Sequence, residues 1–169
     1  MPSRTLVKRS DKVAFFGNMG TGTETFNRMR GFTTLSGSKN PSEYSRQYVD
    51  EEFETTDVTG YSPSYDFGFD QYKGDLVHDE MVEILDGEKT GTEARRNIVI
   101  VDFSQEVTGQ DGVYRAVKRE WAIIGDSEGD SMDAYTYSGN LRATGKRITG
   151  TATLNSDSSV ATFTPDTSL

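Results

Sequence analysis

The chain contains no cysteine, and that absence excludes several chemistries at once. Disulfide frameworks, thiol nucleophiles and cysteine-ligated zinc all require this residue. Histidine is almost absent too, because His78 is the only one in the sequence. A catalytic triad or a catalytic zinc site needs histidine held beside suitable partners, so the sequence offers little on which to build either.

Long hydrophobic runs are also missing. No stretch of the sequence approaches the roughly 20 apolar residues that a membrane helix needs. Residues 1–12 are basic but lack the apolar segment of a signal peptide. We therefore expect a protein that is made in a cytoplasm, stays soluble and has no membrane partner. At 169 residues the chain matches one domain, so we expect a single core formed from residues 1–169.

The net charge of −9 is unevenly distributed. Residues 1–49 carry eight Lys or Arg against three acids, whereas residues 50–92 carry two lysines against thirteen acids. This pattern is expected if the front of one copy meets the flank of another. It is equally expected if the two segments neighbour each other inside one subunit, and the sequence leaves both interpretations open.

Strand signals dominate the rest of the chain, and we expect eight or nine strands. Residues 64–71 alternate, with Tyr65, Phe67 and Phe69 on one face and Asp66 and Asp70 on the other, which indicates a half-buried strand. Residues 97–103 form a nearly continuous apolar run, which indicates a central strand covered on both faces. Further strands are predicted at residues 12–16, 26–35, 43–49, 113–124, 134–141, 144–154 and 160–163, and a loop at residues 36–42.

One helix is predicted over residues 75–86. Its apolar residues, Leu76, Val77, Met81, Ile84 and Leu85, recur at helical spacing. An aspartate at position 75 is a suitable N-cap, and the glycine at position 87 can end the helix. The histidine at position 78 lies off this stripe, so we expect it on the surface. Long strands with one helix predict a mainly β fold, a β-sandwich or partly closed barrel flanked by one α-helix.

Motifs that carry chemistry are weak throughout. Gly20-Thr21-Gly22 lacks the third glycine and the following helix of a dinucleotide fingerprint. The acids Asp126, Glu128, Asp130 and Asp133 miss the spacing of a calcium loop and favour a hairpin tip kept soluble by charge. Asp66 and Asp70 on one strand stand about 13 Å apart, beyond the spacing of a glycosidase pair. We therefore predict no enzyme, no cofactor and no metal.

The order of these features resembles the major tail tube protein of long-tailed, non-contractile bacteriophages. The resemblance runs from about residue 31 to residue 150. Its segments are Gly31-Phe32-Thr33-Thr34-Leu35-Ser36, then Tyr48-Val49-Asp50-Glu51, then Gly60-Tyr61-Ser62-Pro63-Ser64-Tyr65-Asp66-Phe67, the helix, the two strands over residues 95–124, and Ser138-Gly139-Asn140-Leu141. Residues 1–30, an N-terminal arm with the first strand, carry little of it.

The resemblance implies hexameric rings that stack into a hollow tube. Strands from all subunits would join into one lumen-lining barrel, which solves the problem of exposed sheet edges by closure. Stacking would continue until another protein stops it. The implied partners are further copies, a tape-measure protein, and tail terminator and initiator proteins. The implied location is the virion, after assembly in the bacterial host cytoplasm.

Particular residues acquire expected roles from this resemblance. Residues 36–56 would form an inter-ring loop whose acids face basic residues of the adjacent ring. The expected interface residues are Arg28, Arg30, Asp50, Glu51, Glu52 and Glu54. An acidic lumen would repel phosphates, so DNA would pass without specific binding. Two sets of lumen residues remain open, namely Asp66 and Asp70, or Thr149, Thr151 and Thr153.

Two alternatives stand beside this interpretation. The first is the inner tube of a contractile tail or tailocin, which shares the fold and would be accompanied by a sheath. The second is a ligand-binding β-sandwich, in which Trp121 and the eight tyrosines would form stacking platforms. Most of these aromatic residues alternate at core spacing, which favours packing over ligand binding.

Overall fold

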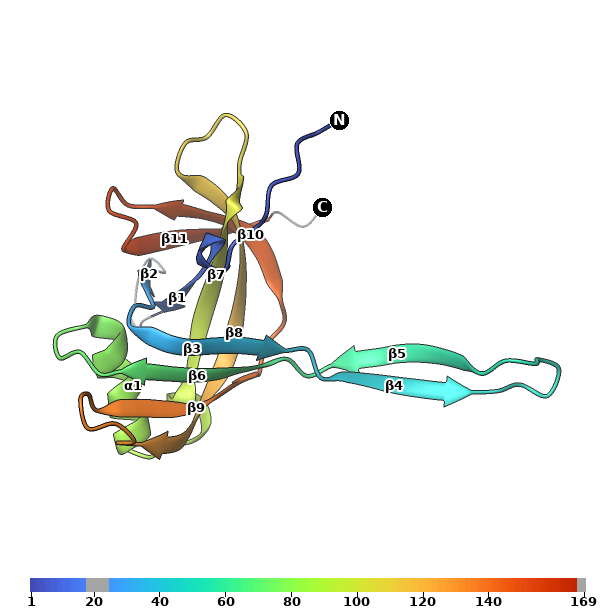
Figure 1. The fold of residues 1–169 in the computed structure, drawn as a ribbon, viewed down its shortest axis with the longest axis horizontal. Coiled ribbons are helices and arrows are strands. Elements are labelled where there is room, and N and C mark those ends of the chain that lie inside the picture. The colour runs from blue at the N-terminus through green and yellow to red at the C-terminus, as the bar shows by residue number, and fades with distance from the viewer. Residues whose placement is uncertain (18–24, 167–169) are drawn as a thin grey trace.

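The computed structural model describes residues 1–17 and 25–166, so most of the glycine-rich segment at residues 17–22 lies outside the described residues. Figure 1 shows the path of the chain. The described elements are η1 (Arg9–Asp11), β1 (Lys12–Gly17), β2 (Thr25–Arg28), β3 (Phe32–Ser38), β4 (Pro41–Arg46), β5 (Thr55–Tyr61), β6 (Ser64–Asp70), α1 (Leu76–Asp86), η2 (Gly91–Ala94), β7 (Arg95–Glu106), β8 (Val113–Glu128), β9 (Thr136–Ala143), β10 (Ile148–Leu154) and β11 (Val160–Pro165).

Six antiparallel strands close into a barrel. Their order is β10-β11-β2-β1-β7-β8, and β8 pairs back with β10 to complete the ring of strands. All six strands contribute to one buried side-chain cluster, which consists of Phe15, Phe26, Val99, Val101, Ala116, Ala152, Ala161 and Phe163. The expected partly closed barrel is therefore fully closed, because β10 bonds to a strand on each side.

The long strand β8 takes part in both the barrel and a second sheet. Its first half, residues 113–118, pairs with β10 in the barrel, and its second half, residues 121–128, pairs with β9. From there a four-stranded antiparallel sheet continues in the order β8-β9-β6-β3. A second cluster joins this sheet to α1, and its members include Phe67, Phe69, Val77, Met81, Ile84, Trp121, Ile123 and Leu141.

Local patterns account for several of these elements. The alternation in β6 is confirmed, because Phe67 and Phe69 are buried while Asp66 is exposed. The prediction that β7 is covered on both faces is also confirmed, because Ile98 belongs to the cluster that joins the sheet to α1 while Val99 belongs to the barrel cluster. The helix begins where expected, because one carboxylate oxygen of residue 75 accepts bonds from the amides of residues 77 and 78.

The strand predicted over residues 26–35 is wrong in its extent. It divides into β2, which belongs to the barrel, and β3, which belongs to the four-stranded sheet. The chain changes sheet at Gly31, whose φ of +72° is readily adopted only by glycine. The predicted loop at residues 36–42 is wrong as well. β3 continues to Ser38, and β4 begins at Pro41, a position that proline tolerates at the start of a strand.

The surface position expected for His78 is wrong, because its side chain is fully buried. Its Nδ1 accepts a hydrogen bond from the Tyr72 amide at 3.0 Å, and its Nε2 lies 2.5 Å from the Arg30 carbonyl oxygen, to which it donates. The histidine precedes Met81 by three residues and so shares the buried face of the helix. Leu76, expected on the apolar stripe, is 62% exposed instead.

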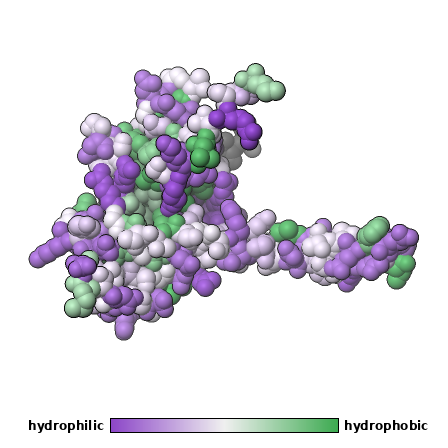
Figure 2. Space-filling model, viewed as in Figure 1, coloured by the Kyte–Doolittle hydropathy of each residue, from purple (hydrophilic) through white to green (hydrophobic). Residues whose placement is uncertain are grey.

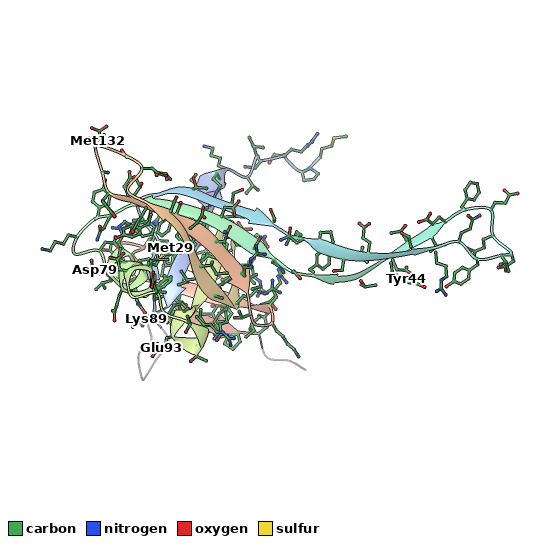
Figure 3. The ribbon with its side chains drawn as sticks, turned by 90° about the horizontal axis from the view of Figure 1, so that it is seen from below. Met29, Tyr44, Asp79, Lys89, Glu93 and Met132 are labelled. Atoms are coloured by element: carbon green, nitrogen blue, oxygen red, sulfur yellow. The ribbon has the colours of Figure 1, made fainter. Side chains whose placement is uncertain are left out.

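Strands β4 and β5 form an arm, defined here as residues 40–62, that stands apart from both layers. They pair with each other in a separate two-stranded sheet. Figure 1 shows the arm continuing the direction of β3 and β6 away from the body. Tyr44 and Tyr48 are 45% and 50% exposed, and Figure 3 shows Tyr44 on the projecting ribbon.

No helix within residues 1–17 and 25–166 is long and apolar enough to cross a membrane.

Candidate self-association surfaces

The four-stranded sheet has two open edges. Over the described part of the chain, β3 pairs with β6 alone, so its outer side has no strand beside it. At the opposite end of the sheet, the pairing of β7 with β8 stops at Ala122, and among the described strands residues 123–128 of β8 pair with β9 alone. Open edges present unpaired amide and carbonyl groups to other chains. Because the two edges are different segments, joining one to the other links copies head to tail.

The sheet face opposite α1 is polar. Register aligns Asp66 with Asn140 on one side and with Ser36 on the other, and aligns Asp70 with Thr136. A shallow groove of about 460 Å³ on this face is lined by Asp66, Asp126 and Asp130 together with hydroxyl side chains, and its lining contains no basic residue. The groove is therefore electrostatically unfavourable to phosphate.

The second set of expected lumen residues lies elsewhere. Thr149, Thr151 and Thr153 belong to β10, whose neighbour Ala152 points into the barrel core, so the threonines face outward from the barrel. At one end of this strand, Arg115 donates two hydrogen bonds to Asp166, at 3.1 and 2.7 Å. These bonds hold the pKa of the Asp166 carboxyl below its usual range. The two sets of expected lumen residues therefore lie on different surfaces of the molecule.

The tip of the arm, residues 47–54, combines carboxylates with exposed apolar side chains. Gln47 donates from Nε2 to the carbonyl oxygens of Glu51 and Glu52, at 3.1 and 3.2 Å, and so closes the turn. Val49 is fully exposed and Phe53 is 79% exposed. Figure 2 shows hydrophobic colour at the end of the arm. The tip carries Asp50, Glu51, Glu52 and Glu54, and none of these acids forms an ion pair within the part of the chain that is described.

The basic residues expected opposite these acids are on the body. Arg28 is half-buried in β2, with its guanidinium 5.9 Å from the centre of the Phe103 ring. Arg30 is exposed in the connection between β2 and β3. None of the ion pairs found among the described residues joins residues 1–49 to residues 50–92. Among the described residues of one subunit, the basic and acidic segments therefore form no direct ion pairs with each other.

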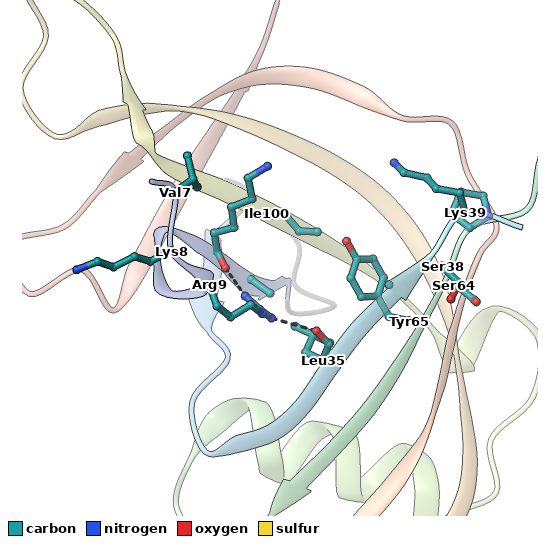
Figure 4. A pocket seen from close by; sticks show the side chains of 13 residues that line it. Val7, Lys8, Arg9, Leu35, Ser38, Lys39, Ser64, Tyr65 and Ile100 are labelled. Carbon is teal, nitrogen blue, oxygen red and sulfur yellow. Dashed lines mark hydrogen bonds between the residues drawn. The ribbon is translucent and has the colours of Figure 1, made fainter. Parts of the chain in front are cut away.

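A pocket of about 460 Å³ opens at the base of the arm, between the N-terminal segment and strands β3 and β6. Its floor is apolar, with Leu35, Tyr65 and Ile100, and its rim carries Lys8, Arg9, Lys12 and Lys39. Figure 4 shows Arg9 inside this rim, where it donates to the carbonyl oxygens of Lys12 and Leu35 at 2.7 and 3.1 Å. Burial raises the pKa of the Tyr65 hydroxyl, against the opposing effect of two nearby arginines.

The acids considered for a calcium loop lie at the end of β8 and in the turn that follows. Asp130 donates its amide to the Thr136 hydroxyl at 3.2 Å, which ties the turn to β9. Across the described residues, no group of three or more histidines or acids lies close enough to hold a metal ion.

No family model matches the sequence, and no curated protein matches it. Solved structures do match. The chain superimposes on a subunit from the tail of an empty GTA particle with C6 symmetry, with a TM-score of 0.58 and 12% identity over 83% of this chain and 96% of that one. The chain has the fold of a tail protein. A second match, to the six-fold symmetrised baseplate of the anti-feeding prophage, has a TM-score of 0.46 and 13% identity over 88% of this chain and 97% of that one.

Sequence reasoning missed one surface of this tail fold. The sequence indicates a basic N-terminal segment and a loop at residues 36–42, but nothing in it predicts that Lys39 lines one pocket with Lys8 and Arg9. These residues line one pocket because β3 runs past η1 and β1, and Lys39 follows directly after its last residue, Ser38. A signal was available, since Lys8, Arg9, Lys12 and Lys39 all precede the acidic middle of the sequence.

Proposed function

We propose that this chain is the repeating structural subunit of a tail tube, built from stacked hexameric rings. The observation that most supports this proposal is the four-stranded sheet with an open edge at each end. The outer edge of β3 in one copy pairs with residues 123–128 of β8 in the next, and repetition closes the ring. The C6 symmetry of the similar GTA tail supports six copies per ring.

The polar face of the sheet then lines the bore. Asp66 and Asp70 lie on this face, whereas Thr149, Thr151 and Thr153 lie on a barrel whose strands are already paired on both sides. A strand with two partners cannot add to a neighbouring sheet, so the aspartate set forms the lumen. The carboxylates of Asp66, Asp126 and Asp130 repel phosphate, which lets DNA slide through without sticking.

The arm connects consecutive rings. An isolated two-stranded hairpin is marginal in water, and this one exposes apolar side chains, so it gains stability by docking on another copy. The inter-ring loop expected at residues 36–56 thus corresponds to the arm, residues 40–62, and the acids at its tip face basic residues of the next ring. Because this contact repeats without end, terminator and initiator proteins set the ends of the tube and a tape-measure protein sets its length.

Electron microscopy and sedimentation of the purified chain test this proposal. The expected result is hollow filaments or hexameric rings whose abundance rises with protein concentration. Reversing both Glu51 and Glu52 to lysine is expected to leave a folded protein that makes no tubes at low salt. A monodisperse monomer at all concentrations and salt levels, even with initiator proteins supplied, would overturn the proposal and favour a ligand-binding module.

A further inference from the structure

We propose that the pocket at the base of the arm is the receptor for the arm tip of a second copy, one ring away. This inference rests on the proposed tube and names the docking site that the tube requires. Its acceptor residues, Lys8, Arg9, Lys12 and Lys39, differ from Arg28 and Arg30, which the sequence suggested.

Charge is the first reason. The tip presents Asp50, Glu51, Glu52 and Glu54 without a basic residue among residues 47–54. The pocket presents four basic residues and no acid in its lining. Within the described ranges, Lys12 is the one rim residue with an ion pair, a long contact of 3.9 Å to Asp102. The acids of the tip and three of the four rim residues therefore have no ion-pair partner among the described residues, and the two surfaces carry opposite charges.

Shape and polarity are the second reason. The exposed side chains of Val49 and Phe53 flank the acidic turn, and they need apolar surface to leave water. The pocket offers that surface in Leu35, Tyr65 and Ile100, directly below the basic rim. An apolar centre surrounded by paired charges is the usual anatomy of a protein interface.

Reach is the third reason. Strands β3 and β6 each have seven residues, so at about 3.3 Å per residue they span about 23 Å. The arm runs ten residues from position 40 to position 50, which is about 33 Å. In a stack of identically oriented rings, a tip that leaves one ring therefore passes the full height of the next sheet. It ends near the arm-bearing end of that copy, where Lys39 and Ser64 frame the pocket.

Cross-linking between two differently labelled chains tests this pairing, because the protein has no native cysteine to interfere. One chain carries Val49→Cys and the other carries Ser38→Cys, two exposed positions on the tip and on the pocket wall. Mixed under assembly conditions with a short bismaleimide, they are expected to give a covalent heterodimer. The control pairs the Val49→Cys chain with an Arg30→Cys chain, which places the label at the rival basic site.

The charge contribution is tested in the same assay. Reversing Lys8 and Lys39 to glutamate is expected to lower the heterodimer yield about tenfold, because two attractive contacts with the acidic tip become repulsive. Combining this change with Glu51→Lys and Glu52→Lys in the partner chain is expected to restore the yield. Restoration is not expected from a variant that has merely misfolded.

The outcomes separate this inference from the tube itself. Tubes that form while Val49→Cys links to Arg30→Cys, or to neither site, overturn the pocket and leave the tube standing. A Val49→Cys to Ser38→Cys link in a preparation without tubes supports the pocket and counts against the tube.

Discussion

His78 joins three parts of the chain through one imidazole. Its ring hydrogen-bonds to the amide of Tyr72 and to the carbonyl of Arg30, and its centre lies 4.7 Å from the centre of the tilted Phe69 ring. We predict that His78→Leu lowers the free energy of unfolding by about 2–4 kcal/mol, because two buried backbone groups lose their partner. Leu76→Ala on the same helix is the control, with an expected change within about 0.5 kcal/mol. Equal losses in urea unfolding would contradict this account.

The hydroxyl group of Tyr137 makes the free energy of unfolding depend on pH. Its hydroxyl donates to the Asp86 carboxylate at 3.2 Å, and burial followed by the Asp86 charge raises its pKa from 10.0 to about 12. Between these two values the unfolded tyrosine loses its proton while the folded one keeps it. The free energy of unfolding therefore falls as pH rises from 10 to 12. Tyr137→Phe is expected to remove this part of the fall, and identical pH curves for the two proteins would contradict the assignment.

The arm is the element whose removal separates folding from assembly. Its two strands pair with each other and share no sheet with the body. We predict that replacing residues 41–61 by Asn-Gly leaves the body folded, because this turn type can join β3 directly to β6. The unfolding free energy is expected to change by less than about 1 kcal/mol, since no core residue is removed.

Assembly of this shortened protein is the second readout. Rings are expected to persist in negative-stain images, because the edges of β3 and β8 are untouched, while tubes are absent. Tubes of normal length made by the shortened protein would show that the arm does not connect rings.

The charge of the bore is a property of the whole molecule. We predict that Asp66→Lys gives tubes that retain DNA at low salt and release it by about 0.2 M salt, because phosphate binding weakens as salt rises. Asp111→Lys changes the net charge equally but lies in the exposed turn between β7 and β8, away from the sheet face. Co-sedimentation of DNA with both kinds of tube measures the difference. Equal DNA retention by both variants would mean that the aspartate face does not line the bore.

Prediction from sequence succeeded where a feature depends on near neighbours. The alternation of β6, the double-sided burial of β7 and the helix with its caps are all local patterns. Prediction from sequence failed where contacts between segments far apart in the chain override these local patterns. Glycine and proline between residues 36 and 42 indicate a loop, yet pairing of β3 with β6 and of β4 with β5 extends the strands through most of that segment.

The candidate surfaces also include residues that the sequence points to and residues that it does not. The acids of the tip and the aspartates of β6 could be named from the sequence, because charge runs and alternation are visible there, and their roles at the interface and in the bore stay predictions. The basic pocket was not predicted, because Lys8 and Lys39 come from segments that only the path of β3 past η1 brings together.

By itself, the sequence determined the strand-rich composition, the position of α1 and the opposite charges of the first and middle thirds. These depend on residue type and on spacing over a few positions. The tertiary structure alone decided that six strands close while four leave two open edges, that the arm projects from the body, and that His78 is buried. Each of these features depends on which strands pair, although they are far apart in the sequence, and on which faces they cover. Such pairing produces no periodic pattern in the sequence.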